Sequence, residues 1–115
     1  MSNIGPMGRH VFAYGSLQIP EVMAAVTGRR FRFEPAVLHG YVRRRLIGRT
    51  YPGLRRRADA VTDGRLYRNV DRRSLARLDR FEDLFYRRRT VEVIAGRRVP
   101  AEVYVIDPRY HHLLE

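Results

Sequence analysis

The chain has 115 residues, 44% of them hydrophobic, which predicts one domain of ordinary size with a sizeable core. It contains no cysteine, and this excludes a disulfide framework, a thiolate nucleophile and a cysteine-based metal site. No apolar run is long enough to span a membrane, and the residues before His10 are too few and too polar for a signal peptide. We therefore expect a cytoplasmic protein with no membrane partner.

The formal net charge is +11, and all 23 basic residues are arginines. An anionic partner such as nucleic acid is one explanation of this excess. Arginine-biased codon usage in the source genome is the other. Some of the arginines form triplets at residues 43–45, 55–57 and 87–89. Neighbours along a strand face opposite sides, so a triplet makes no single patch, and charge alone is weak evidence for nucleic-acid binding.

A single domain is expected over residues 10–115, after a flexible tail over residues 1–9 that contains two glycines and a proline. Residues 11–14 predict a short apolar strand, which the following glycine ends. A short helix is expected over residues 20–26, because the proline suits its first turn and Gly28 is a natural C-terminal cap.

Strands dominate the pattern from there to residue 106. Gly40 is expected to form a bulge or a bend inside one strand, and Pro52-Gly53 a turn that ends another. A turn at residues 95–97 joins the last two strands, and Asp107-Pro108 stops the final one. The expected strands cover residues 36–42, 45–51, 60–67, 90–94 and 99–106.

A second helix is expected over residues 72–83, because Asp71 is a good N-cap. The strands are not separated by regular helices, so a doubly wound parallel sheet is excluded. The pattern therefore predicts a small α+β fold. Its internal glycines indicate a sheet that bends strongly, with a barrel as one outcome.

The second helix carries a carboxylate on its apolar face. At about 100° per residue, Glu82 falls inside the stripe that contains Leu75 and Leu78. Asp79 falls at the edge of this stripe, and Asp83 is expected in solvent. A buried carboxylate is costly unless it is paired or becomes neutral. Burial would raise its pKa toward the range of a general acid or base near neutral pH, whereas a buried ion pair with an arginine is the alternative.

The strand at residues 11–14 runs into Tyr14-Gly15-Ser16-Leu17, a turn that could expose consecutive backbone N–H groups. Such a nest binds an anion or an oxyanion, and a plain strand-to-loop turn is the alternative. Ser16 does not lie in the Gly-x-Ser-x-Gly pattern of a nucleophile. The histidines have no catalytic or metal-binding spacing; they are His10, His39, His111 and His112.

Several short segments between residues 10 and 106 form a pattern whose order and spacing are specific. They are 10–17, 36–41, 51–53, 61–67, 78–83, 86–87 and 101–105. In this pattern the chain resembles the gamma-glutamylcyclotransferase-like family, which includes the AIG2-like proteins and gamma-glutamylamine cyclotransferases. The resemblance implies a small mixed β-barrel with flanking helices, of the α+β class.

The resemblance also implies roles for individual residues. Glu82 matches the family's acid/base glutamate, and the usual glycine after it is Asp83 here, a departure that changes the start of the following loop. The turn after the first strand would hold the glutamyl end of the substrate. The substrate-binding residues expected on this basis are Tyr14, Gly15, Ser16, Leu17, Tyr51 and Tyr86.

The implied reaction converts an L-γ-glutamyl amide or amine to 5-oxoproline and a free amine, with Glu82 as general acid/base. It needs no metal and no cofactor, and its only partner is the small-molecule γ-glutamyl substrate. Two alternatives stay open at this point. One is a non-catalytic relative of the same fold that binds a small molecule, and the other is an arginine-rich nucleic-acid-binding module.

Overall fold

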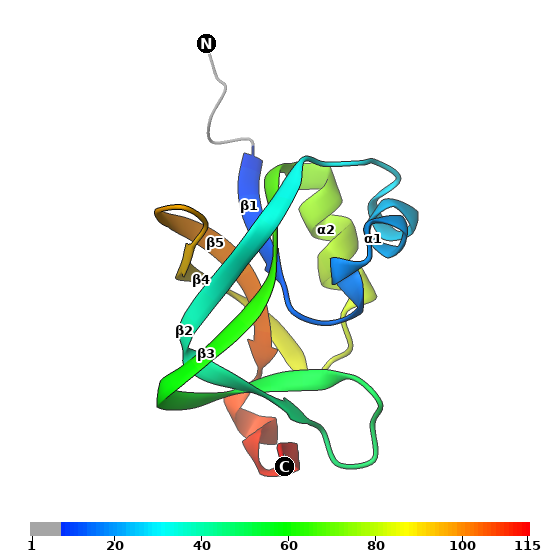
Figure 1. The fold of residues 1–115 in the computed structure, drawn as a ribbon. Helices are drawn as coiled ribbons and strands as arrows, with labels where there is room; N and C mark the ends of the chain where they lie inside the picture. The colour runs from blue at the N-terminus through cyan, green and yellow to red at the C-terminus, as the bar shows by residue number, and fades with distance from the viewer. Residues whose placement is uncertain (1–7) are drawn as a thin grey trace.

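The computed structural model describes residues 8–115, which fold into a closed five-stranded barrel with two α-helices packed on one side (Figure 1). The strands are β1 (Gly8–Ala13), β2 (Phe33–Arg45), β3 (Pro52–Asp71), β4 (Tyr86–Ile94) and β5 (Arg98–Ile106). The helices are α1 (Pro20–Thr27) and α2 (Arg72–Phe81), and the 3-10 segments are η2 (Ser16–Gln18) and η3 (Pro108–Leu113).

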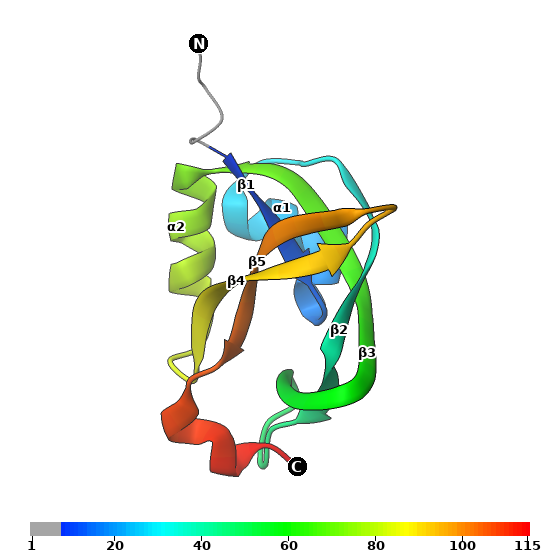
Figure 2. The same cartoon turned by 90° about the vertical axis from the view of Figure 1, so that its left-hand side faces the viewer.

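The order of the strands around the barrel is β1-β3-β2-β4-β5. β1 and β5 are parallel, whereas the other neighbours are antiparallel, so the barrel is mixed, as expected. β2 and β4 meet in a single pair, Val37 with Ile94, and then diverge. Between β2 and β4 the barrel is therefore closed at this one pair only. Figure 2 shows the β2–β3 hairpin and the β4–β5 hairpin separating below it.

Two glycines allow the long β2–β3 hairpin to curve. Gly40 has a φ of +88°, and the register shifts between His39 and Tyr41, so the predicted bulge is confirmed. Gly64 permits a close approach of β1, because a Cβ there would lie 2.3 Å from the carbonyl oxygen of Ala13.

Alternation along β1 separates two apolar cores. Phe12 belongs to the core inside the barrel, and its neighbours Val11 and Ala13 belong to the core between the barrel and the helices. The helices contribute Met23, Leu75 and other residues to this outer core. Burial of these side chains fixes α2 against the outside of the barrel, which sets where its C-terminal end lies.

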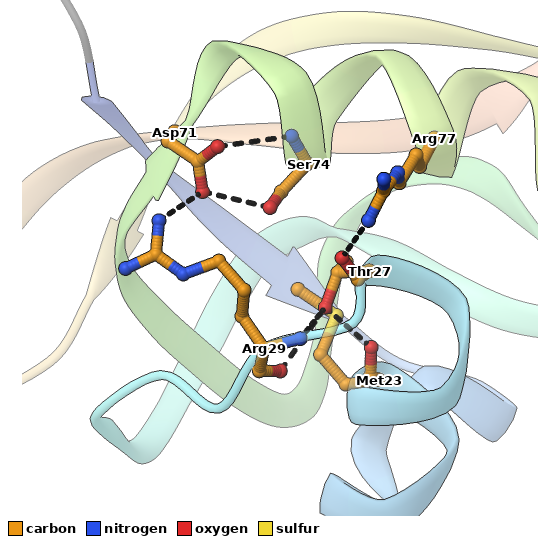
Figure 3. A network of polar contacts seen from close by, with 6 residues as sticks. All are labelled: Met23, Thr27, Arg29, Asp71, Ser74 and Arg77. Atoms are coloured by element: carbon orange, nitrogen blue, oxygen red, sulfur yellow. Dashed lines mark hydrogen bonds and ion pairs between the residues drawn. The ribbon is translucent and has the colours of Figure 1, made fainter.

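A polar network joins the two helices (Figure 3). The Asp71 carboxylate caps α2 by accepting hydrogen bonds from the backbone N–H and the hydroxyl of Ser74, which confirms the predicted N-cap. Arg77 donates to the carbonyl oxygen of Thr27 at the end of α1 at 2.6 Å. Gly28 follows with a φ of +80°, as a C-cap glycine should.

The strand predicted over residues 45–51 is wrong. β2 ends at Arg45, and Pro52 pairs with it to begin β3, so Pro52-Gly53 starts a strand where a turn was expected. Leu46 is fully buried because it reaches the C-terminal segment, where it forms an isolated bridge with Leu114. The apolar Leu46 in the β2–β3 connection led to the strand prediction, but a distant segment buries this residue, not a neighbouring strand of the barrel.

Several boundaries also differ from expectation, and most of the strands are longer than expected. β3 is one strand of 20 residues that includes the predicted segment 60–67. β1 begins at Gly8, so pairing with β3 takes in the last two residues of the expected tail, and residues 1–7 lie outside the described part. α2 ends at Phe81, two residues earlier than expected. Within residues 8–115, no helix is both long and apolar enough to cross a membrane.

Candidate active site

A cavity of about 260 Å³ lies between the end of β1, the start of β3 and the end of α2. All the residues expected at the catalytic and substrate site line this one cavity, although they come from three separate parts of the chain. Their roles in binding and catalysis stay predictions. The residues expected from the sequence are Tyr14, Gly15, Ser16, Leu17, Tyr51, Glu82 and Tyr86; the structure adds Phe12, Ala13, Pro52, Phe81, Asp83 and Tyr104.

Glu82 is the residue at which the chain leaves α2. Its N–H still donates to the Leu78 carbonyl oxygen at 3.0 Å, but its own backbone is extended, with φ −68° and ψ 142°. Glu82 thus lines the cavity although it is no longer helical, and its role as the acid of the site stays a prediction. Phe81, which would continue the apolar stripe, is half exposed.

Among residues 8–115, the Glu82 carboxylate has no cationic partner. Arginines form ion pairs with acids throughout the chain, but none does so with Glu82 among residues 8–115. Burial raises the pKa of Glu82 to about 7, and the charges of Asp83 and Asp79 add to the increase. The structure thus favours a titrating carboxyl group over the buried ion pair that the sequence left open.

The two neighbouring acids have partners of their own. Asp83 is half-buried and accepts a hydrogen bond from the Tyr51 hydroxyl at 2.6 Å, so its expected position in solvent is wrong. Asp79 accepts from the Tyr104 hydroxyl at 2.5 Å and from Arg88 at 2.9 Å. Both acids lie close enough to Glu82 to contribute to its raised pKa.

The turn after β1 lines the same cavity and contains backbone donors that are unused within the described chain. The N–H groups of Gln18 and Ile19 close η2 by donating to Gly15 and Ser16, respectively. The N–H groups of residues 15–17 donate to no acceptor within the described chain. A row of free N–H groups beside a carboxyl group can hold a negatively charged oxygen.

Side chains from the barrel hold this turn in place. The Tyr14 carbonyl oxygen accepts from Arg43 at 3.0 Å, and the Leu17 carbonyl oxygen accepts from the Tyr67 hydroxyl at 2.6 Å. Arg65 donates to the Gln18 carbonyl oxygen at 3.0 Å. The carbonyl groups are thus turned to the protein, which leaves the N–H groups of the turn free.

Tyrosines form much of the cavity wall, and their hydroxyls are already engaged. Tyr14 donates to the Tyr104 carbonyl oxygen at 2.6 Å, and Tyr86 donates to the Pro52 carbonyl oxygen. Burial raises the pKa of Tyr14, Tyr86 and Tyr104 well above the usual range, so these hydroxyls stay neutral. The tyrosines shape the cavity, and Glu82 is the group in it that can exchange a proton near neutral pH.

Two of these features could be recognised only in three dimensions. Tyr104 lies in the last family-like segment, so the pattern pointed to its strand but not to its place beside Glu82. The Asp83–Tyr51 contact joins residues far apart in the chain. His10, for its part, accepts a hydrogen bond from the Asn69 N–H, and within residues 8–115 no cluster of three acidic or histidine side chains could hold a metal.

These features define a class of protein: a small mixed β-barrel in which a carboxyl group without an ion pair and a turn with free backbone N–H groups line one cavity. The family model described as "Gamma-glutamyl cyclotransferase, AIG2-like" matches residues 11–114. The chain belongs to this family.

Individual relatives agree with this assignment. AIG2-like protein C of Arabidopsis thaliana is 36% identical over 104 residues, which cover 88% of this chain and 60% of that protein. A solution structure of a protein from Arabidopsis thaliana is 34% identical, with a TM-score of 0.80, and covers 96% of this chain and 72% of its own. A structure of a gamma-glutamyl cyclotransferase has a TM-score of 0.76 at 17% identity, and the match covers 90% of this chain and 73% of that one. At this identity the match shows only that the fold is shared.

Proposed function

We propose that this protein is a cofactor-independent cyclotransferase, which converts an L-γ-glutamyl amide or amine to 5-oxoproline and a free amine. The observation that carries the proposal is the Glu82 carboxyl group, which is partly buried, forms no ion pair among residues 8–115 and has a pKa raised to about 7 by desolvation. Membership of the family supports the class of reaction. The chain spans only 60% of AIG2-like protein C. The activity is therefore proposed from the residues of this chain and is not taken over from that relative.

The raised pKa suits the first proton transfer. Ionised Glu82 would take a proton from the α-ammonium group of the substrate, whose ordinary pKa is about 8. A carboxyl group at about 7 is nearly matched to that donor, whereas an ordinary glutamate would be too weak a base by about 3 to 4 pKa units. Desolvation of the Glu82 carboxyl group costs free energy, and in this proposal it serves to raise the basicity of the group.

Ring closure follows from the freed amine. Its nitrogen forms a bond to the γ-carbonyl carbon of the same molecule, which closes a five-membered ring with the advantage of an intramolecular attack. The γ-oxygen becomes an oxyanion, and the free N–H groups of residues 15–17 would stabilise it. When the oxyanion re-forms the carbonyl, the bond to the leaving nitrogen breaks and protonated Glu82 gives its proton to the leaving amine.

The test is to incubate the protein with a panel of γ-glutamyl amines and peptides and to measure 5-oxoproline by mass spectrometry. We expect 5-oxoproline from at least one member of the panel, and its loss in Glu82→Gln. The exposed Glu92, which lies on β4 away from the cavity, provides the matched control Glu92→Gln. Binding without 5-oxoproline from any substrate would contradict the proposal and favour the non-catalytic relative.

A further inference from the structure

A second cavity, of about 230 Å³, lies between the two hairpins of the barrel. It occupies the region where β2 and β4 diverge after their single pair, and η3 borders it (Figure 2). It shares no lining residue with the Glu82 cavity. Its lining comprises Tyr41, Leu54, Arg55, Arg56, Arg87, Arg89, Val105, Ile106, Pro108, His111 and Leu114.

Two arginines of β4 occupy positions that face the inside of the barrel. Arg87 pairs with Val105 and Arg89 with Val103, and cross-strand partners share a face of the sheet. Both valines belong to the core inside the barrel. Arg88, between them, faces the other way, where it pairs with acids outside this cavity. The triplet is thus divided between two faces, and two of its cations point toward the barrel opening.

A third inward cation comes from β3. Arg56 pairs across the strands with Tyr41, which packs against the inner core, and its guanidinium lies over the Tyr41 ring at 5.5 Å. Arg55 lies beside it and donates to the Leu114 carbonyl oxygen at 3.0 Å. Parts of two arginine triplets, far apart in the chain, therefore meet at one cavity.

One acid lies close to these charges: Asp107 pairs with Arg109 and also experiences the charge of Arg87, but it does not line the cavity. The lining contains no acidic residue, and within residues 8–115 none of the three inward arginines forms an ion pair. The floor is apolar, because Leu54, Val105 and Ile106 are buried there. Like charges gathered over an apolar floor repel each other and strengthen the field that an anion experiences.

We propose that this cavity binds a small organic phosphate, whose phosphate group is held by Arg56, Arg87 and Arg89 and whose apolar part lies on the floor. A phosphate monoester has three terminal oxygens and carries nearly two negative charges, so several guanidinium groups can bind it together. A single carboxylate offers only two oxygens. The cations sit at inward-facing positions, so a small molecule that enters the cavity fits them better than a nucleic-acid duplex.

Calorimetric titration of the full chain with phenyl phosphate and with inorganic phosphate tests the proposal. We expect saturable binding of both, with phenyl phosphate the tighter because its ring covers the apolar floor. The double variant Arg56→Gln, Arg89→Gln should weaken phenyl phosphate binding about 100-fold, since each charge-assisted hydrogen bond contributes at least about tenfold.

The matched control is Arg44→Gln, Arg57→Gln, which removes the same charge from the triplets at residues 43–45 and 55–57, at positions that do not line this cavity. It should leave the affinity within about threefold, because exposed charges outside the cavity are screened. Thermal unfolding separates a folding defect from lost binding: the cavity variant should melt at or above the wild-type temperature, since repulsion is relieved, yet lose the increase that phenyl phosphate gives. An equal loss in the control, an unchanged affinity in the cavity variant, or binding of duplex nucleic acid alone would overturn the proposal.

Discussion

Two glutamates in this protein, the buried Glu102 and the partly buried Glu82, have opposite surroundings. Glu102 is 6% exposed, and its carboxylate accepts from Arg88 at 2.7 Å and from the Thr90 hydroxyl at 2.6 Å. Glu82 lines a cavity together with Arg88 as well, yet it forms no ion pair within the described chain. It also lines the cavity whose wall consists largely of tyrosines. Asp83, which also lacks an ion pair, at least accepts a hydrogen bond from Tyr51, whereas the Glu82 carboxyl group has neither kind of partner among residues 8–115. A partly buried acid without partners is typical of a site where charge has to change.

The contrast between the two glutamates is tested most strongly by exchanging each of them for glutamine. Glu82→Gln should lower the rate of 5-oxoproline formation about 1,000-fold or more, in the upper range for loss of a general acid/base, and leave the protein folded. Initial rates by mass spectrometry measure the effect. A rate within tenfold of wild type would mean that Glu82 does not transfer the proton.

Glu102→Gln should do the reverse. It leaves Arg88 with one partner fewer in a buried setting, so we expect the free energy of unfolding to fall by about 3 kcal/mol. The folded fraction should still form 5-oxoproline, because Glu102 does not line the cavity that Glu82 shares with the turn after β1, although both glutamates line the neighbouring one. Urea unfolding beside rate measurements tests both parts, and a stable but inactive Glu102→Gln protein would contradict the division of roles.

Stability against pH gives the next largest effect. The pKa of Glu82 is raised in the folded state, so its contribution to stability is present below the unfolded pKa of about 4.5 and is lost as pH rises through about 7. Glu82→Gln removes this loss. The variant should therefore gain on wild type between pH 4 and pH 8 by about 1–3 kcal/mol of unfolding free energy. Urea unfolding at both pH values measures this gain. If the difference in unfolding free energy between variant and wild type does not depend on pH, the pKa of Glu82 is not raised in the folded state.

Removal of a neighbouring charge should move the active pH range. Ionised Glu82 is the base, so kcat/KM should rise with pH to a plateau, with a midpoint near 7. Asp79→Asn removes one negative charge that raises the pKa of Glu82, and the midpoint should fall by about half a pH unit. Asp59→Asn, at an exposed position, is the control and should not shift it. A midpoint that moves upward in Asp79→Asn would contradict this electrostatic explanation.

The smallest effect is expected from Tyr51→Phe. The change removes the hydrogen bond to Asp83 and keeps the aromatic ring against Tyr86, where the ring centroids are 5.9 Å apart. Stability should fall by about 1 kcal/mol, as for one partly exposed hydrogen bond. Thermal unfolding checks this, and a loss several times larger would mean that Tyr51 supports more of the cavity than its contacts indicate.

Local signals predicted the parts of the fold that local chemistry controls. The Asp71 cap, the glycine after α1 and the bulge at Gly40 are each set by residues next to them in the chain, and the sequence predicted all three correctly. The strand over 45–51 was wrong because Leu46 is buried by Leu114, a contact that no local pattern contains.

The same contrast holds for the sites. Glu82 stood out because the acid falls on the apolar side of a helix, a local property, and the family pattern then assigned it a role. The Tyr51 hydroxyl that binds Asp83, and the meeting of Arg56 with Arg89, depend on how distant strands are brought together. Periodicity along one element could not predict either.

Direct titration of the Glu82 carboxyl group by carbon-13 NMR tests the central claim most directly. Comparison of wild type with Glu82→Gln assigns the resonance, and Glu92 serves as an exposed reference in the same spectra. The account predicts a pKa of about 7 for Glu82 in the folded protein without substrate. A pKa near the ordinary glutamate value of about 4.3 would contradict it, because Glu82 would then be too weak a base for the proposed cyclisation.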